Sequence, residues 1–245
     1  MTYQPGPYGP GPHGTAPYAS VPTGPYAGQP GSGQSGYGQS GYAPAPYGTP
    51  VAPVRRRPGI VASGLFMGTW LFLLWALEGV DTLLGGALDQ FGVSPRDPAE
   101  LPQILTAPFL HFGFSHVAAN SIPFLVLGLI VLLSGGRQFL FATVAAAVGS
   151  GLFAWLLSEP RTVTAGASGL VFGWLAFLLV RGLFAGNWKQ ILIAAAVFGF
   201  FGGILWGIFP GQPGISWQGH LGGAVGGGLA AWWLVRRAKK SPTAT

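Results

Sequence analysis

Apolar residues dominate the chain from Ile60 onward, and only short polar or glycine-rich stretches interrupt them. Crossing the hydrocarbon core of a bilayer takes about 20 mostly apolar residues, with a range of roughly 17–25. Six runs approach that length: residues 60–77, 117–133, 139–157, 168–184, 191–209 and 219–235. They lack the polar faces that six helices around a soluble core would need. The pattern predicts an all-α polytopic membrane protein, built as a bundle of six transmembrane helices.

The first 54 residues differ from the rest, because they contain no Asp, Glu, Lys or Arg. They hold all 7 tyrosines and 12 of the 22 prolines, and "SGQSGYGQSGY" is a short imperfect repeat. Such a segment has too little aliphatic surface to offset the entropy cost of ordering. We therefore predict a disordered Pro/Gly/Tyr-rich tail over 1–54, a six-helix domain over 55–240 and a short tail over 241–245. His13 lies in the first tail and is given no role.

Charged residues make up only 7% of the chain, and they sort by side of the membrane. With the N-terminus placed inside, most of the 12 basic residues fall on the inner side: Arg55, Arg56, Arg57, Arg137, Arg181, Lys189, Arg236, Arg237, Lys239 and Lys240. All 6 acidic residues fall outside or at the outer end of a span. Because Lys and Arg are enriched in cytoplasmic loops, we predict a multi-pass protein of the cell (plasma) membrane with both termini cytoplasmic. The basic residues are then topology signals, so the net charge of +6 does not indicate a nucleic-acid partner.

Four polar side chains lie within or at the ends of the apolar runs. Such groups are costly at membrane depth and are functional hypotheses by default. His116 and Asn120 begin the second predicted span, four residues apart and so on one helix face. Ser168 begins the fourth span and His220 the sixth. In the predicted topology these three helices all run inward, so the four side chains are expected at one depth near the external face.

A serine and a histidine at matched depth form a possible nucleophile and general base. Ser168 is the candidate nucleophile and His220 the candidate base, and Phe172, one turn after Ser168, could pack against the His220 ring. An oxyanion would need hydrogen-bond donors. The amide of Ser168 at a helix start, with His116 and Asn120, could supply them. No acid has an obvious place as a third member, so a Ser–His dyad is expected.

Contact between Ser168 and His220 requires the fourth and sixth helices to approach closely, which small residues permit in lipid. The sequence supplies glycines at suitable spacing, namely Gly166, Gly169, Gly173, Gly219, Gly223 and Gly227. We therefore predict tight packing between these two helices.

Each polar residue also has a plainer interpretation. Ser168 alone could be a helix cap, Asn120 a bond between helices, and His220 a donor to a carbonyl. A metal site from His111, His116 and His220 has no carboxylate clearly joining it, and the chain has no cysteine. We expect no metal and no cofactor, and we interpret His111 as a structural residue that braces the outer loop. The dyad is preferred because the plainer interpretations need four independent coincidences of depth.

Three short motifs resemble the rhomboid family of intramembrane serine proteases. They are "HVAAN" at 116–120, "GASG" at 166–169 and "GHLGG" at 219–223, and the resemblance covers about residues 60–238. It implies Ser168 as the nucleophile and His220 as the general base and then acid. The other implied roles are oxyanion stabilisation by His116, Asn120 and the Ser168 amide, packing of Phe172 on the catalytic histidine, and a structural role for His111.

The resemblance also implies the substrates, which are transmembrane segments of other membrane proteins with small or helix-weakening residues near the cut. The lipid bilayer is the other partner. The fifth helix and the loop 209–218 would be the gate and cap. Some bacterial members carry a Trp–Arg pair in the first outer loop, whereas Arg96 has no neighbouring tryptophan. A catalytically inactive relative that binds transmembrane helices is the alternative, and a small transporter with a polar pocket is a third hypothesis.

Overall fold

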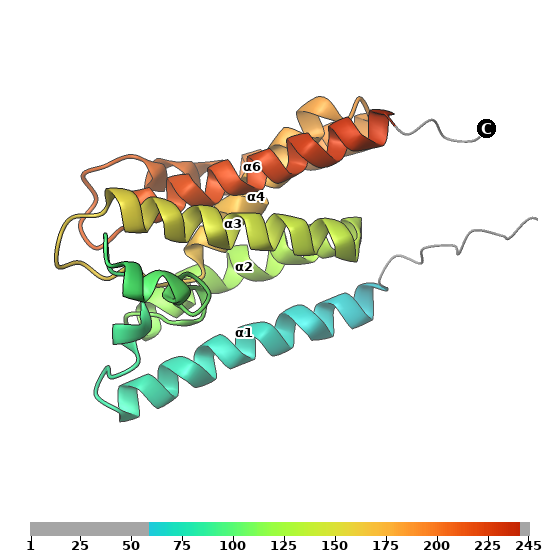
Figure 1. The fold of residues 1–245 in the computed structure, drawn as a ribbon. Coiled ribbons are helices and arrows are strands. Elements are labelled where there is room, and N and C mark those ends of the chain that lie inside the picture. Colours follow the sequence, from blue (N-terminus) through green and yellow to red (C-terminus); the bar gives the residue numbers. More distant parts are fainter. Residues whose placement is uncertain (1–58, 241–245) are drawn as a thin grey trace, which may run out of the picture. The chain divides into compact units, whose positions relative to one another are not determined.

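The computed structural model describes residues 59–240, and the structural statements below concern that part of the chain. These residues are mostly helical (Figure 1). The α-helices are α1 (Ile60–Leu83), α2 (Phe114–Ser134), α3 (Gly136–Leu157), α4 (Ser168–Phe184), α5 (Trp188–Phe201) and α6 (Trp217–Lys240). The connections contain the 3-10 segments η1 (Asp89–Phe91), η2 (Pro98–Ile104), η3 (Ala107–Phe109) and η4 (Gly202–Ile208). Within the described residues, extended pairing is limited to one antiparallel bridge between Val93 and Thr164.

The prediction of an all-α bundle of six helices is confirmed, and each predicted span overlaps one helix. Three of the predicted ends are wrong, and one of them is the end of the sixth helix, which continues from residue 235 to Lys240. The first helix continues past residue 77 to Leu83, with Glu78 and Asp81 buried in its last turns instead of beginning a loop. The fifth span is α-helical only to Phe201 and then tightens into η4, which begins with two glycines of low helix propensity. The predicted tails, 1–54 and 241–245, and His13 lie outside the described residues.

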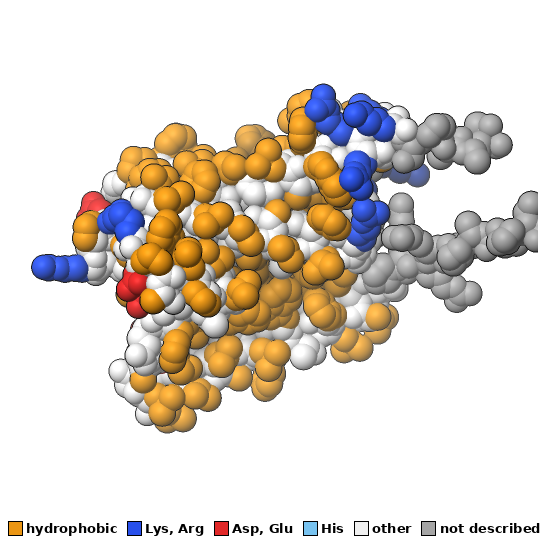
Figure 2. All heavy atoms as spheres, viewed as in Figure 1, with side chains coloured by type: hydrophobic (Ala, Val, Ile, Leu, Met, Phe, Trp, Pro, Cys, Tyr) orange, Lys and Arg blue, Asp and Glu red, His pale blue; other side chains and the backbone are white. Residues whose placement is uncertain are grey.

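Four helical stretches of the described residues are long and apolar enough to cross a bilayer: α1, α2, α3 and Trp188–Ile208. The helix α4 is also apolar but has 17 residues, and α6 is diluted by glycines and by the basic residues of its last turns. Apolar side chains cover the visible outer surface, and Lys and Arg gather mainly at one end (Figure 2). The chain is therefore a multi-pass membrane protein.

The centre of the bundle is an aromatic cluster around Trp174 of α4, which is fully buried. Its ring centroid lies 5.0 Å from that of Phe124 in α2 and 5.6 Å from that of Phe139 in α3. Trp70 of α1 approaches it edge-on at 6.2 Å. The indole N–H of Trp174 donates to Thr143 Oγ1 at 3.0 Å, so its polar atom is satisfied. This cluster ties α4 to three neighbouring helices.

The contact between α4 and α6 is a glycine seam, in agreement with the predicted tight packing. A methyl group at Gly223 would collide with the backbone of Gly169, and one at Gly227 would collide with the backbone of Gly173. Backbones come this close only where side chains are missing. The seam therefore sets the separation between the helix that carries Ser168 and the helix that carries His220.

A second glycine row on α6 faces α3. A Cβ at Gly222 would meet the carbonyl of Gly149, and one at Gly226 would meet the carbonyl of Ala145. The glycine-rich helix is thus wedged between α3 and α4, with close backbone contact on both sides. This arrangement accounts for the many glycines of α6, which serve packing and not lipid contact.

We expect Gly227→Ala to destabilise the bundle by about 3 kcal/mol, because the added methyl group would press on backbone that cannot rotate away. Reversible unfolding in mixed detergent micelles measures this loss. Gly228→Ala is the matched control, since its Cβ would meet only Val180 Cγ2 at an ordinary 3.6 Å. Equal losses in the two variants would contradict the seam.

The α1–α2 connection is pinned to the end of the bundle at which α4 begins. Arg96 N donates to Trp155 O at 3.0 Å, and Trp155 Nε1 donates back to Asp97 O at 2.8 Å. Val93 and Thr164 exchange two backbone hydrogen bonds of 2.8 and 2.9 Å. Arg96 is therefore hydrogen-bonded through its backbone N–H to a tryptophan of α3, although no tryptophan neighbours it in the sequence. The connection holds the segment just before α4 in place.

Candidate active site

Ser168 and His220 meet, although they lie on different helices and 52 residues apart. Ser168 is the first residue of α4, and His220 lies in the first turn of α6. The distance between Ser168 Oγ and His220 Nε2 is 2.8 Å, which is a short hydrogen bond. Ser168 does not cap its helix: the N-cap is Ala167, and the cap has no side-chain hydrogen bond. Its hydroxyl is therefore directed at the imidazole.

The environment of His220 fixes its ring and tautomer. Nδ1 lies 3.0 Å from the carbonyl oxygen of Gly207, in η4. A carbonyl only accepts hydrogen bonds, so Nδ1 carries the proton and the lone pair of Nε2 faces the Ser168 hydroxyl. The ring stacks on Phe172 with centroids 4.1 Å apart and planes 14° apart. Within the described residues, these two hydrogen bonds are the ones that the ring makes, and no carboxylate takes part.

His116 lies at the start of α2, and its ring lines the same cavity as Ser168 and His220. Its Nδ1 accepts a long hydrogen bond from Phe112 N at 3.4 Å, so in the neutral ring Nε2 carries the N–H. A Cβ at Gly166 would lie 2.9 Å from His116 Nε2 and 3.7 Å from Ser168 Oγ. The space that this glycine leaves open is therefore next to both a donor and the serine oxygen. Gly166 also has φ +128°, which L side chains rarely adopt.

Asn120 and the Ser168 amide are the other candidate donors. Asn120 is buried, and its Nδ2 donates to His116 O at 3.1 Å, within its own helix and not across to another. An amide group has a second N–H that this bond leaves available. The Ser168 N–H is at a helix start and has no acceptor within the helix. The two amides and His116 thus lie around one cavity.

A cavity of about 1330 Å³ contains the whole constellation. Its lining includes all five candidate residues, His116, Asn120, Ser168, Phe172 and His220. Exposed residues of the α5–α6 connection, 210–215, line its other side. The cavity is large enough to hold water and an extended peptide segment beside the Ser168 hydroxyl.

His111 supports this site from behind. It is 2% exposed, and its Nε2 accepts from Ala167 N at 3.3 Å, directly before the serine. Its ring meets that of His116 edge-on, with centroids 5.1 Å apart. Burial, and to a lesser degree the neighbouring His116, lowers the pKa of His111 to about 4. The geometry therefore ties His111 to the start of α4, whereas the sequence interpretation tied it to the outer loop.

Acidification should destabilise the fold through His111. Its folded-state pKa is about 4, below the ordinary value of 6.5, so the unfolded chain binds the proton more tightly. The contribution of neutral His111 to the free energy of unfolding is complete above pH 6.5, and up to about 3 kcal/mol of it is lost as the pH falls to 4. The melting temperature in detergent, followed between pH 7 and 4, measures the loss. His111→Gln keeps an acceptor for Ala167 and should make this dependence shallower; an unchanged slope would contradict the assignment.

Two contributors to the site were missed by the sequence analysis. The carbonyl of Gly207 orients the histidine, and backbone carbonyls leave no trace in a sequence. The open space at Gly166 depends on a positive φ that only the structure reveals. A glycine between Trp206 and Ile208 in an apolar run was the available signal for the first of these. Among residues 59–240, no three His, Cys, Asp or Glu side chains are grouped as metal ligands would be.

Comparisons with known proteins agree with this architecture. The model of the Rhomboid domain matches residues 98–237. Uncharacterized protein Rv1337 of Mycobacterium tuberculosis is 42% identical over 201 residues, covering 79% of this chain and 84% of that protein. Rhomboid-like protein 11, chloroplastic, of Arabidopsis thaliana is 28% identical over 150 residues, covering 55% of this chain and 52% of that protein. The fold and the matched domain define a polytopic helical membrane protein. The chain belongs to the rhomboid family, as its three motifs suggested.

Proposed function

We propose that this protein is an intramembrane serine endopeptidase, with Ser168 as nucleophile and His220 as general base. The observation that carries the proposal is the 2.8 Å contact between Ser168 Oγ and His220 Nε2, with Nδ1 held by a carbonyl. Membership of a family of serine proteases is consistent with it. A serine hydroxyl is a weak nucleophile until an adjacent base removes its proton.

The proposed reaction is acyl transfer in two halves. Ser168 Oγ attacks the carbonyl carbon of the scissile bond while its proton passes to His220 Nε2. The negative charge on the former carbonyl oxygen is stabilised by the N–H groups of Ser168, His116 and Asn120. The imidazolium then gives its proton to the leaving nitrogen, and the C–N bond breaks. Water repeats the sequence on the acyl-enzyme and restores the Ser168 hydroxyl.

Gly207 takes the place that a third acidic member has in a triad. Its carbonyl holds the Nδ1 proton at 3.0 Å, which fixes the tautomer and stabilises the imidazolium that forms. The stacked Phe172 ring limits rotation of the imidazole. The dyad is therefore oriented by the backbone of η4 and by one aromatic ring, in a site where a buried carboxylate would be costly.

The substrates we propose are transmembrane segments of other proteins. A peptide bond inside a helix has its carbonyl in the helical hydrogen-bond ladder, so a helix must unwind before Ser168 can attack. Helix-weakening residues near the cut lower that cost. Helix α5 and the connection that follows η4 are proposed as the gate and cap, since η4 and residues 210–216 line the cavity.

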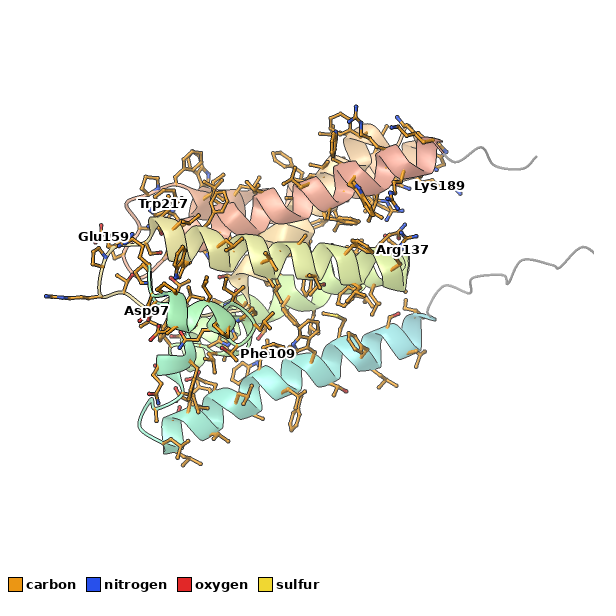
Figure 3. The ribbon with its side chains drawn as sticks, viewed as in Figure 1. Asp97, Phe109, Arg137, Glu159, Lys189 and Trp217 are labelled. Carbon is orange, nitrogen blue, oxygen red and sulfur yellow. The ribbon has the colours of Figure 1, made fainter. Side chains whose placement is uncertain are left out.

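The proposed location is the plasma membrane, with both termini cytoplasmic and the cavity open to the external face. Charge distribution supports this orientation. Asp97 and Glu159 lie at the end where α6 begins with Trp217, whereas Arg137 and Lys189 lie at the other end (Figure 3). An excess of basic residues is typical of cytoplasmic ends. The partition into two tails and a domain over 55–240 remains part of the proposal.

The test is proteolysis of a panel of single-span helices by the purified full-length chain in nanodiscs. Cleavage of a helix containing Gly and Pro, together with sparing of a matched poly-Leu helix, is the expected result. Fragment masses locate the cut. Binding of these helices without cleavage of any would instead identify a catalytically inactive rhomboid, and solute flux that survives Ser168→Ala would identify a transporter.

A further inference from the structure

The end of the bundle opposite the cavity is rich in basic residues that have no part in the proposed proteolysis, and it is called the basic end below. Its described basic residues are Arg137, Arg181, Lys189, Arg236, Arg237, Lys239 and Lys240. The six acidic residues of the same part of the chain all lie in the last turns of α1, the α1–α2 connection or the α3–α4 connection. These elements lie at the other end of the bundle, away from Arg137 and Arg237 (Figure 1).

Two arginines of this end are positioned by a pair of stacked rings. The guanidinium carbon of Arg137 lies 5.5 Å from the ring centroid of Phe141, and that of Arg237 lies 4.2 Å from that of Trp233. The two rings stack on each other, with centroids 5.3 Å apart and planes 27° apart. Phe141 belongs to α3 and Trp233 to α6, so each arginine lies one turn beyond its ring toward the same end.

We propose that Arg137 and Arg237, which lie against the two stacked rings, together bind the headgroup of one anionic phospholipid. Both arginines are exposed, and each guanidinium can offer a planar pair of N–H donors to phosphate oxygens. The cation–π contacts hold the guanidinium groups in place before a ligand arrives, which lowers the entropy cost of binding.

The neighbouring surface favours a lipid as the source of that phosphate. Leu140 is 59% exposed, Phe141 38% and Trp232 41%, and all three lie within a turn or two of the arginines. These side chains belong to helices of a membrane-embedded bundle, so acyl chains can lie on them while the headgroup reaches the arginines. Basic residues at the cytoplasmic ends of membrane helices commonly attract anionic headgroups. The site is independent of the proposed protease activity.

The test is native mass spectrometry of the full-length chain with dioleoylphosphatidylglycerol or dioleoylphosphatidylcholine. We expect one retained phosphatidylglycerol per chain and much less phosphatidylcholine. The double variant Arg137→Gln/Arg237→Gln should weaken retention of phosphatidylglycerol roughly 30-fold. Lys239→Gln/Lys240→Gln is the matched control, because it removes the same charge from the same end away from the ring pair and should retain the lipid.

Several results would overturn the proposal. Equal weakening in the lysine pair would mean diffuse charge attraction, and equal retention of phosphatidylcholine would mean apolar contact alone. We expect inorganic phosphate at millimolar concentration to displace none of the bound phosphatidylglycerol. Full displacement would indicate a site for free phosphate instead of a lipid. Arg237→Lys keeps the charge but loses the planar fork, and it is expected to weaken retention about fivefold. Circular dichroism of each variant verifies that it is folded.

Discussion

Ser168→Ala should reduce cleavage of a susceptible transmembrane helix by roughly 10⁴-fold or more, and His220→Ala should reduce it to a similar level. The hydroxyl and the imidazole act as one unit, since their 2.8 Å contact is the route of the transferred proton. The rate constant for cleavage in nanodiscs, measured with substrate in excess, gives both effects. The binding of substrate should change little, because neither side chain is expected to contribute most of the contact area.

The double variant Ser168→Ala/His220→Ala is the control for this unit. Its residual rate should equal that of either single variant, since once one partner is gone the other has nothing to do. Effects that multiply would mean that the two side chains act separately and would contradict the dyad. Measurable turnover by Ser168→Ala would show that another group is the nucleophile.

Gly207→Ala should lower the turnover rate by about 100-fold without unfolding the protein. A Cβ at this position would lie 2.8 Å from Phe172 Cζ and 2.9 Å from His220 Nδ1, so the stacked rings must shift. A displacement near 1 Å at a catalytic group commonly costs about two orders of magnitude in rate. Single-turnover kinetics measure the loss, and the melting temperature monitors the fold.

Gly203→Ala is the matched control, since it lies in the same 3-10 segment and a Cβ there meets nothing within 4 Å. Its turnover should be close to that of the wild type. If the two variants lose activity alike, the segment matters for its flexibility, and the close packing of Gly207 against Phe172 and His220 has no special part in orienting the imidazole.

The sequence was enough to predict the bundle, because long apolar runs have few solutions in a bilayer. The predicted ends failed where local and tertiary preferences compete. Glu78 and Asp81 suggested a loop, yet they are buried in the last turns of α1. The two glycines after Phe201 turned the end of the fifth helix into a 3-10 segment, which apolarity alone could not predict.

The candidate site was predicted to the extent that side chains define it. His116, Asn120, Ser168, Phe172 and His220 line one cavity, as their shared depth suggested. The residue pattern could not predict which backbone groups surround these side chains. The Gly207 carbonyl, the Phe112 amide and the Ala167 amide determine which nitrogens of the three histidines carry protons. Such contacts follow from chain geometry and have no residue-type signature.

The central claim is that His220 activates the hydroxyl of Ser168. Its most direct test is the rate of covalent labelling by a fluorophosphonate in detergent, with the labelled peptide identified by mass spectrometry. We expect one adduct, on Ser168, formed at least about 100-fold more slowly in His220→Ala and not at all in Ser168→Ala. An adduct at another residue, or labelling of Ser168 at the same rate without His220, would contradict the account.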